Sequence, residues 1–124
     1  MKINLSDGEW KLMSQLWEGP KTIAQLTAAL KEETGWGKHT VITMLSRLEA
    51  KGAVHHNGET PKLYSPLLTC DQAQRRETES FLHKVYGGRL GLMMSAMVDA
   101  KALSAEDIEE LSAILEKAKG GDEG

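Results

Sequence analysis

We predict a mainly α-helical fold with a small β-hairpin, in which an N-terminal winged helix-turn-helix unit precedes a three-helix dimerisation unit. Three observations on the 124-residue sequence support this prediction. Six stretches place apolar residues at helical spacing, several of them behind a capping box. One pair of β-prone runs, joined by a turn, follows the third stretch. The last three helices carry more aliphatic surface than so short a segment can bury alone.

Capping boxes mark the start of the first two helices, Ser6 with Glu9 and Thr22 with Gln25. Gly19-Pro20 ends the first helix, because glycine and proline commonly follow a helix C-terminus. Apolar residues recur at helical spacing, as Trp10, Met13, Leu16 and Trp17 in the first helix and as Ile23, Leu26, Ala29 and Leu30 in the second. Both helices are therefore expected to turn one face toward a shared core.

The third helix is expected over residues 38–51, and a hairpin follows it. The core stripe of this helix is Val41, Met44 or Leu45, and Leu48. Residues 53–57 and 62–68 favour short strands joined by a turn of about four to five residues. A brief strand at residues 21–22 could pair with this hairpin. The order helix, helix, helix, hairpin is typical of a winged helix-turn-helix.

Three further helices are expected after the hairpin. Thr69 with Gln72 forms another capping box, before a helix over residues 70–86 that ends at Gly87-Gly88. A fifth helix covers residues 89–100, and a sixth begins after Ser104.

We therefore expect a DNA-binding domain at 1–68, a helical dimerisation domain at 69–119 and a disordered tail at 120–124. The methionine-rich fifth helix suggests a partner, most simply a second copy of the chain. The expected dimer core is Leu82, Val85, Leu90, Met93, Met94, Met97, Leu111 and Leu115.

The net charge of −3 is unevenly distributed along the chain. Residues 1–66 carry eight Lys/Arg and seven Asp/Glu, whereas residues 67–124 carry seven Lys/Arg and eleven Asp/Glu.

Composition excludes disulfides within the chain, all-cysteine metal sites and membrane spans. The single Cys70 excludes an intramolecular disulfide and an all-cysteine metal site. The longest nearly apolar run, Leu92–Val98, is far shorter than the roughly 20 residues of a membrane span. We expect a cytoplasmic protein without membrane insertion.

The chain shows no nucleophile elbow, phosphate-binding loop, zinc-protease helix or convincing carboxylate pair. We therefore expect neither an enzyme nor a bound cofactor. His55 and His56 are adjacent on a strand and should point to opposite faces, so no metal site is expected. Cys70, at a helix start, is expected to be structurally indifferent.

The outward edge of residues 38–51 mixes hydroxyls, cations and one aliphatic side chain. It comprises Lys38, His39, Thr40, Ile42, Thr43 and Ser46. In a DNA major groove, a thymine methyl would suit Ile42, while hydroxyls and amines would pair with base edges and phosphates. Arg47 is expected either to reach phosphate or to pair with an acid, and Lys62 on the hairpin to contact phosphate. The predicted partner is a double-stranded DNA operator.

The sequence resembles the penicillinase-repressor family, the BlaI/MecI group, which also includes copper-responsive repressors. The similarity rests on "SDGEWKLMSQLW", on "HTVITMLSRLEAKGAV" in the expected recognition helix, on "FLHKVYGG" and on "DIEELSAILEK". It implies a homodimeric repressor on a palindromic operator. It also implies release by a sensor-linked protease that cuts within the dimerisation unit, in a β-lactam response of bacterial antibiotic resistance.

The sequence departs from the family pattern at four places. His39 stands at the family's recognition-helix lysine, and Ile42 at a nearby arginine position. The Asn-Phe bond cut in the β-lactam branch aligns with Ala96-Met97, so we predict that proteolytic release here follows another recognition rule or is absent. The cysteine-rich motif of the copper branch is missing.

Two alternative functions compete with DNA-bound repression. The first is a winged-helix module that holds a protein partner, which a wide apolar patch on the helix over 38–51 would favour. The second is a metal-responsive regulator, which would require convergence of residues among His55, His56, His83 and Cys70.

Overall fold

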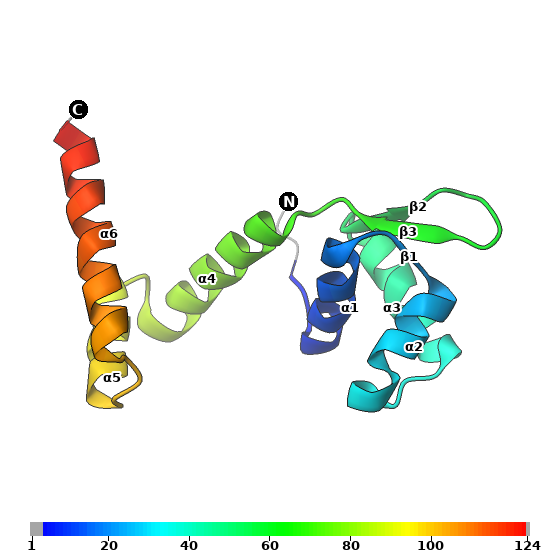
Figure 1. Cartoon of the computed structure of the whole chain (residues 1–124), viewed down its shortest axis with the longest axis horizontal. Coiled ribbons are helices and arrows are strands. Elements are labelled where there is room, and N and C mark those ends of the chain that lie inside the picture. Colours follow the sequence, from blue (N-terminus) through cyan, green and yellow to red (C-terminus); the bar gives the residue numbers. More distant parts are fainter. Residues whose placement is uncertain (1–3, 124) are drawn as a thin grey trace. The chain divides into compact units, whose positions relative to one another are not determined.

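The computed structural model describes the backbone of residues 4–123 and the side chains of residues 4–120. It confirms a mainly α-helical chain with one small sheet (Figure 1). The elements are α1 (Asp7–Glu18), β1 (Lys21–Thr22), α2 (Ile23–Thr34), α3 (Lys38–Ala50), β2 (Val54–His56), β3 (Leu63–Pro66), α4 (Cys70–Tyr86), α5 (Leu90–Asp99) and α6 (Ala105–Glu123).

The chain forms two compact units, one reaching to Glu79 and the other beginning at Ser80. The division falls inside α4, eleven residues beyond the expected boundary at residue 68. The role assigned to each part, DNA binding before the boundary and dimerisation after it, stays a prediction. Helix α6 continues to Glu123 through most of the segment expected as a tail, and Gly124 lies outside the described residues.

The capping boxes expected from the sequence start their helices. The Ser6 hydroxyl accepts a hydrogen bond from the Glu9 N–H at 3.2 Å, and the Glu9 carboxylate accepts one from the Ser6 N–H at 2.8 Å. Thr22 and Gln25 repeat this exchange at the start of α2. Each box satisfies backbone donors that the first helical turn would otherwise leave unpaired. The helix starts are thus fixed by local sequence.

The core of the first unit is formed by α1, α2, α3 and the sheet. Its fully buried side chains include Leu12, Met13, Leu16, Leu26, Val41, Leu45, Leu48 and Val54. Val41, Leu45 and Leu48 are the stripe expected for α3, with Leu45 in the core and Met44 only half-buried against it. This stripe fixes which face of α3 turns away from the protein.

The sheet has the order β1-β3-β2, and both pairings are antiparallel. The short strand expected at residues 21–22 pairs with β3, with Lys21 opposite Tyr64. We call β2, β3 and the turn between them, residues 57–62, the wing. The turn is six residues long, slightly longer than expected, and Asn57 and Leu63 are hydrogen-bonded across its base.

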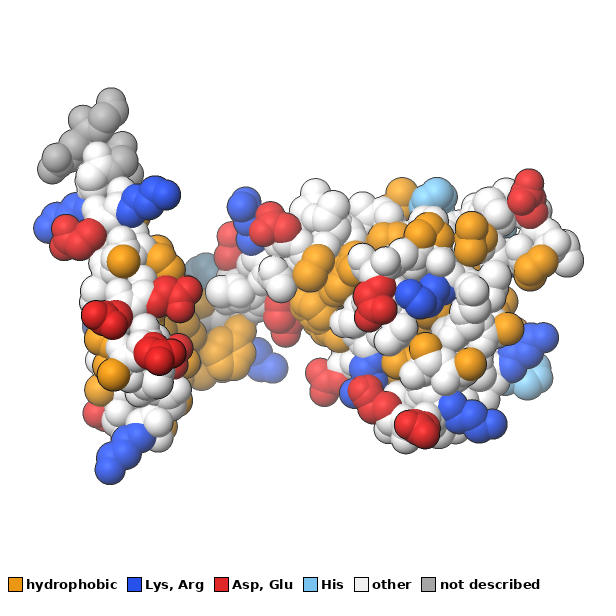
Figure 2. Space-filling view, viewed as in Figure 1, with side chains coloured by type: hydrophobic (Ala, Val, Ile, Leu, Met, Phe, Trp, Pro, Cys, Tyr) orange, Lys and Arg blue, Asp and Glu red, His pale blue; other side chains and the backbone are white. Residues whose placement is uncertain are grey.

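The second unit buries almost nothing within one chain. Helix α5 has no buried residue, and Leu90, Val98, Ile114 and Leu115 are all at least half exposed. Figure 2 shows hydrophobic atoms at the surface along this unit. A polypeptide seldom orders so much exposed apolar surface without a partner.

Candidate DNA-binding surface

The outer face of α3 lies opposite its buried stripe. Six of the residues expected to contact DNA are exposed there: Lys38, His39, Thr40, Thr43, Ser46 and Arg47. Ile42 is half-buried, so only part of this aliphatic side chain faces outward. The expected set therefore shares one continuous helix face, with Ile42 at its flank.

A shallow groove of about 330 Å³ runs along this face. It is lined by His39, Thr40, Thr43, Met44 and Arg47. The Thr43 hydroxyl donates to the His39 carbonyl at 3.0 Å. Since that bond uses its only proton, the outward lone pairs of Thr43 are arranged to accept hydrogen bonds. Within the described residues no carboxylate lies within 4 Å of Arg47, so its guanidinium is unpaired.

A second groove, of about 280 Å³, separates the wing from the start of α2. Lys38 at the start of α3 and Lys62 at the end of the wing turn both line it, together with Ile23, Ala24, Thr60 and Pro61. The sequence did not predict that Lys38, expected on the DNA-facing edge of α3, and Lys62, the expected phosphate contact, would share one groove. Their proximity depends on how the hairpin folds back over α2.

Lys31 is a candidate that the sequence reasoning missed. It lines a neighbouring hollow of about 360 Å³ together with Lys38, Ala24, Thr27 and Ala28. Residues 24, 27, 28 and 31 lie on one face of α2, because their spacing is helical. This spacing in the sequence is the signal that could have identified a face of small residues that ends in Lys31. Neither Lys31 nor Lys38 has an acidic partner among the described side chains.

The wing turn is ordered by its own side chains. The Asn57 carboxamide oxygen accepts hydrogen bonds from the N–H groups of Glu59 and Leu63, both at 3.1 Å. The Asn57 N–H also donates to the Leu63 carbonyl at 3.2 Å. These three bonds close the turn and bring Lys62 to its base. The backbone position of Lys62 is therefore set by the turn itself.

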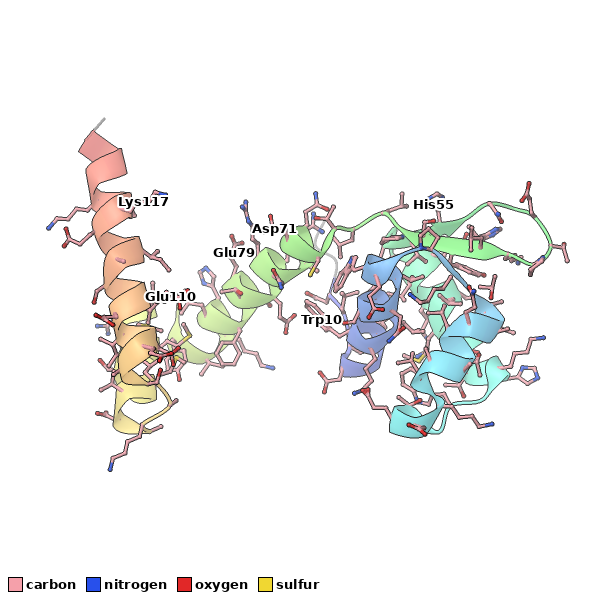
Figure 3. All side chains as sticks on the ribbon, in the orientation of Figure 1. Trp10, His55, Asp71, Glu79, Glu110 and Lys117 are labelled. Carbon is pink, nitrogen blue, oxygen red and sulfur yellow. The ribbon has the colours of Figure 1, made fainter. Side chains whose placement is uncertain are left out.

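The two wing histidines lie in different surroundings. His55 is exposed and projects from β2 (Figure 3), whereas His56 is half-buried beside α3. Cys70 is half-buried at the start of α4. Among the side chains of residues 4–120, no three of His, Cys, Asp or Glu are grouped so that they could hold a metal ion. The convergence that a metal-responsive regulator would need is not found in this part of the chain.

Two long-range contacts hold α1 against α3. The Lys51 ammonium at the end of α3 lies 2.6 Å from the Glu9 carboxylate and donates to the Asn4 carbonyl at 2.8 Å. In the same first turn of α1, a Cβ added to Gly8 would lie 2.6 Å from the Met44 methyl and 3.2 Å from Trp36. A side chain at position 8 would therefore displace the flexible end of the groove-lining Met44 and press on Trp36.

The residues expected to form a dimer core lie on α4, α5 and α6. Val85, Leu90 and Leu115 are exposed, and Leu82, Met93, Met94, Met97 and Leu111 are half-buried. Met94, Met97 and Leu111 line a groove of about 400 Å³ between α5 and α6. Of the pair at the aligned cleavage position, Ala96 is exposed and Met97 is half-buried.

Comparison with known proteins gives concordant matches. Residues 5–117 match the Penicillinase repressor family. The Penicillinase repressor of Bacillus licheniformis is 32% identical over 117 residues, which cover 93% of this chain and 91% of the relative. The Methicillin resistance regulatory protein MecI of Mammaliicoccus sciuri is 26% identical, with 91% of this chain and 94% of the relative covered.

A solved structure resembles part of the chain. The solution structure of the DNA binding domain of the repressor BlaI superposes with a TM-score of 0.52 and 29% identity, over 58% of this chain and 93% of that one. Among the described helices none is long and apolar enough to cross a membrane. The chain therefore belongs to the penicillinase repressor family, whose members of the BlaI/MecI type are transcriptional repressors with a winged-helix domain.

Proposed function

We propose that this protein is a homodimeric transcriptional repressor that inserts α3 into the major groove of a palindromic operator and sets the wing on the neighbouring backbone. The observation that carries the proposal is the outer face of α3, where polar and cationic side chains stand opposite the buried stripe. Lys38 at the start of that face, and Lys31 and Lys62 beside it, have no acidic partners among the described residues.

The chemistry of this surface suits both parts of DNA recognition. Lys31, Lys38 and Lys62 would contact phosphates and fix the register of α3. Thr43 would accept a hydrogen bond from a base amino group, and the exposed part of Ile42 would contact a thymine methyl. Arg47 would reach a guanine edge or a phosphate. His39, Thr40 and Ser46 would complete the contacts along the helix.

The same surface argues against a protein-interaction module. Such a module would need a broad apolar patch on α3. The apolar side chains that reach this face are Ile42 and Met44, and both are half-buried. The groove beside them is lined by a histidine, two threonines and an arginine as well as Met44. Hydroxyls and cations at these positions favour a nucleic acid over a protein surface.

The second unit supports the homodimer. A single chain leaves the apolar side chains of α5 and α6 exposed or half-buried, including all the predicted core residues there. Association of two copies would bury them and would link two copies of α3. Linked half-sites raise affinity because the second binding event becomes intramolecular.

A sensor-linked protease would have to reach the Ala96-Met97 bond on α5. Exposure of Ala96 in the single chain is compatible with access, but the dimer would cover the neighbouring Met97. We retain the prediction that cleavage follows a different rule from the Asn-Phe branch or is absent. Blotting the repressor from cells under the inducing stress distinguishes a fragment ending near Ala96 from intact protein.

The direct test combines electrophoretic mobility shift with sedimentation. The probe is the DNA immediately upstream of the protein's own gene, with a scrambled duplex of equal length as control. We expect one shifted species with two chains per duplex and much tighter binding to the upstream DNA. Equal affinity for both duplexes would contradict operator recognition, and a 1:1 complex of a monomeric chain would contradict the homodimer.

A further inference from the structure

His56 touches the wing turn with one ring nitrogen and faces α3 with the other. Its Nδ1 accepts a hydrogen bond from the Gly58 N–H at 3.0 Å. Its Nε2 lies 3.4 Å from the Glu49 carboxylate, near the C-terminal end of α3. Gly58 has a φ of 77°, a left-handed conformation that glycine adopts readily within a tight turn.

The hydrogen bond from Gly58 selects one tautomer of the neutral ring. An Nδ1 that accepts an N–H carries no proton, so the proton of the neutral imidazole resides on Nε2 and faces Glu49. The ring also packs on Tyr64, with centroids 5.4 Å apart and planes inclined by 56°. Burial, and then the charge of Glu49, raises the pKa of Tyr64, so this phenol stays neutral beneath the ring. His56 is therefore held on three sides.

The turn that His56 touches is the turn that carries Lys62. Gly58 and Lys62 belong to one loop, which Asn57 closes through its bonds to Glu59 and Leu63. Lys62 and Lys38 line the same groove. A shift of the turn relative to α3 would therefore move Lys62 relative to the side chains that face the major groove.

We propose that His56 is a positioning residue for DNA recognition, which locks the wing turn to α3 so that Lys62 reaches its phosphate in register with the base contacts. The inference rests on the proposed function, because it requires α3 and the wing to touch the same duplex. His56 itself contacts no DNA in this account. It acts through Gly58 on one side and Glu49 on the other, and a phosphate contact out of register contributes less to specific binding.

The test uses the full chain and a duplex that the wild-type protein selects from a random pool, with a scrambled duplex as reference. Affinities are measured for the His56→Ala and Lys62→Ala variants and for the double variant. We expect His56→Ala to weaken binding to the selected duplex by about fivefold to tenfold. In a chain that already carries Lys62→Ala, the His56→Ala change should weaken binding to the selected duplex by less than about a further twofold, because His56 acts through that lysine.

Two conservative variants separate the contacts of the ring. His56→Asn keeps an acceptor near the Nδ1 position for the Gly58 N–H, and His56→Gln keeps a donor near the Nε2 position for Glu49. Each should restore part of the affinity that His56→Ala loses. Glu49→Gln should weaken binding in the wild type but not in His56→Ala. Thermal unfolding of each variant verifies that the first unit is folded. If His56→Ala does not fold, His56→Asn takes its place in the comparison of single and double variants with Lys62→Ala.

The outcomes distinguish the inference from the proposed function. Additive losses for His56→Ala and Lys62→Ala, or wild-type affinity in His56→Ala while Lys62→Ala binds weakly, would overturn the positioning role alone. Failure of the wild-type chain to select any duplex would overturn the proposed function. Equal losses of affinity for His56→Ala on the selected and scrambled duplexes would also contradict the inference, because a residue that positions the wing relative to α3 should matter most where bases are read.

Discussion

The Lys51 ammonium lies 2.6 Å from the Glu9 carboxylate and joins the C-terminal end of α3 to the first turn of α1. Glu9 is 3% exposed, so its charge depends on Lys51 and on the Ser6 N–H for compensation. We predict that Glu9→Gln, which keeps the shape but removes the charge, lowers the free energy of unfolding by about 1–3 kcal/mol. The measurement is urea denaturation of the full chain.

This contact also predicts how stability responds to acid. Burial by itself would raise the pKa of Glu9, but the hydrogen bonds and charge from Lys51 and Ser6 outweigh burial and hold it below the ordinary value of 4.5. A lowered carboxyl pKa stabilises the fold fully above the unfolded-state pKa and loses that effect as pH falls through the folded-state pKa. The stability gap between wild type and Glu9→Gln should therefore narrow below a pH of about 4.5.

Lys11→Met provides the control, because the Lys11–Glu33 pair is well exposed on both sides at 3.3 Å. Exposed pairs of this kind contribute about 0–1 kcal/mol. If Lys11→Met lowered the free energy of unfolding as much as Glu9→Gln does, the Glu9–Lys51 contact would contribute no more to stability than an exposed ion pair.

Gly8 allows the close approach of α1 to Met44 and Trp36. The added methyl of Gly8→Ala would displace the flexible end of Met44 and press on the Trp36 ring. We predict a loss of about 1–3 kcal/mol in the free energy of unfolding, reduced when Met44→Ala is added, since the smaller side chain leaves room. Thermal denaturation of the two single variants and the double variant measures this coupling. Strictly additive losses would mean that the contact with Met44 is not the cause.

The salt dependence of DNA binding should report the cations beside α3. We predict that Lys31→Gln and Lys62→Gln each weaken binding to any duplex and reduce the slope of log Kd against log salt by about 0.9 per chain. The matched control is Lys11→Gln, whose lysine already pairs with Glu33. An unchanged slope in Lys31→Gln would remove Lys31 from the phosphate contacts.

The second unit should be needed for dimerisation and for tight binding. Leu115 is 63% exposed in the single chain, so Leu115→Asp should leave the fold of the monomer intact. In a dimer the same change would bury a carboxylate, and we predict a monomeric chain by sedimentation. Operator affinity should fall by about 10²-fold or more, because the half-sites are no longer linked. A Leu115→Asp chain that still sediments as a dimer would place the interface elsewhere.

The sequence predicted best what depends on local pattern. Capping boxes such as Ser6 with Glu9 located the helix starts, and the spacing of Val41, Leu45 and Leu48 oriented α3 correctly. The pairing of residues 21–22 with the hairpin was also predicted correctly, as β1 with β3.

Contacts between distant elements could not be predicted in the same way. The approach of His56 to Glu49 depends on the register of β2 against β3 and on where the hairpin lies over α3. The shared groove of Lys38 and Lys62 depends on the closure of the wing turn by Asn57. Helical or strand periodicity carries no information on either, because it describes one element at a time.

The most direct test of the account measures the affinity of Ile42→Ala and Thr43→Ala for the selected operator and for a scrambled duplex at one salt concentration. If the outer face of α3 reads bases, each change should cost about 1–3 kcal/mol on the operator and almost nothing on the scrambled duplex. Wild-type affinity for the operator in both variants, or equal losses on both duplexes, would contradict the assignment of α3 as the recognition helix.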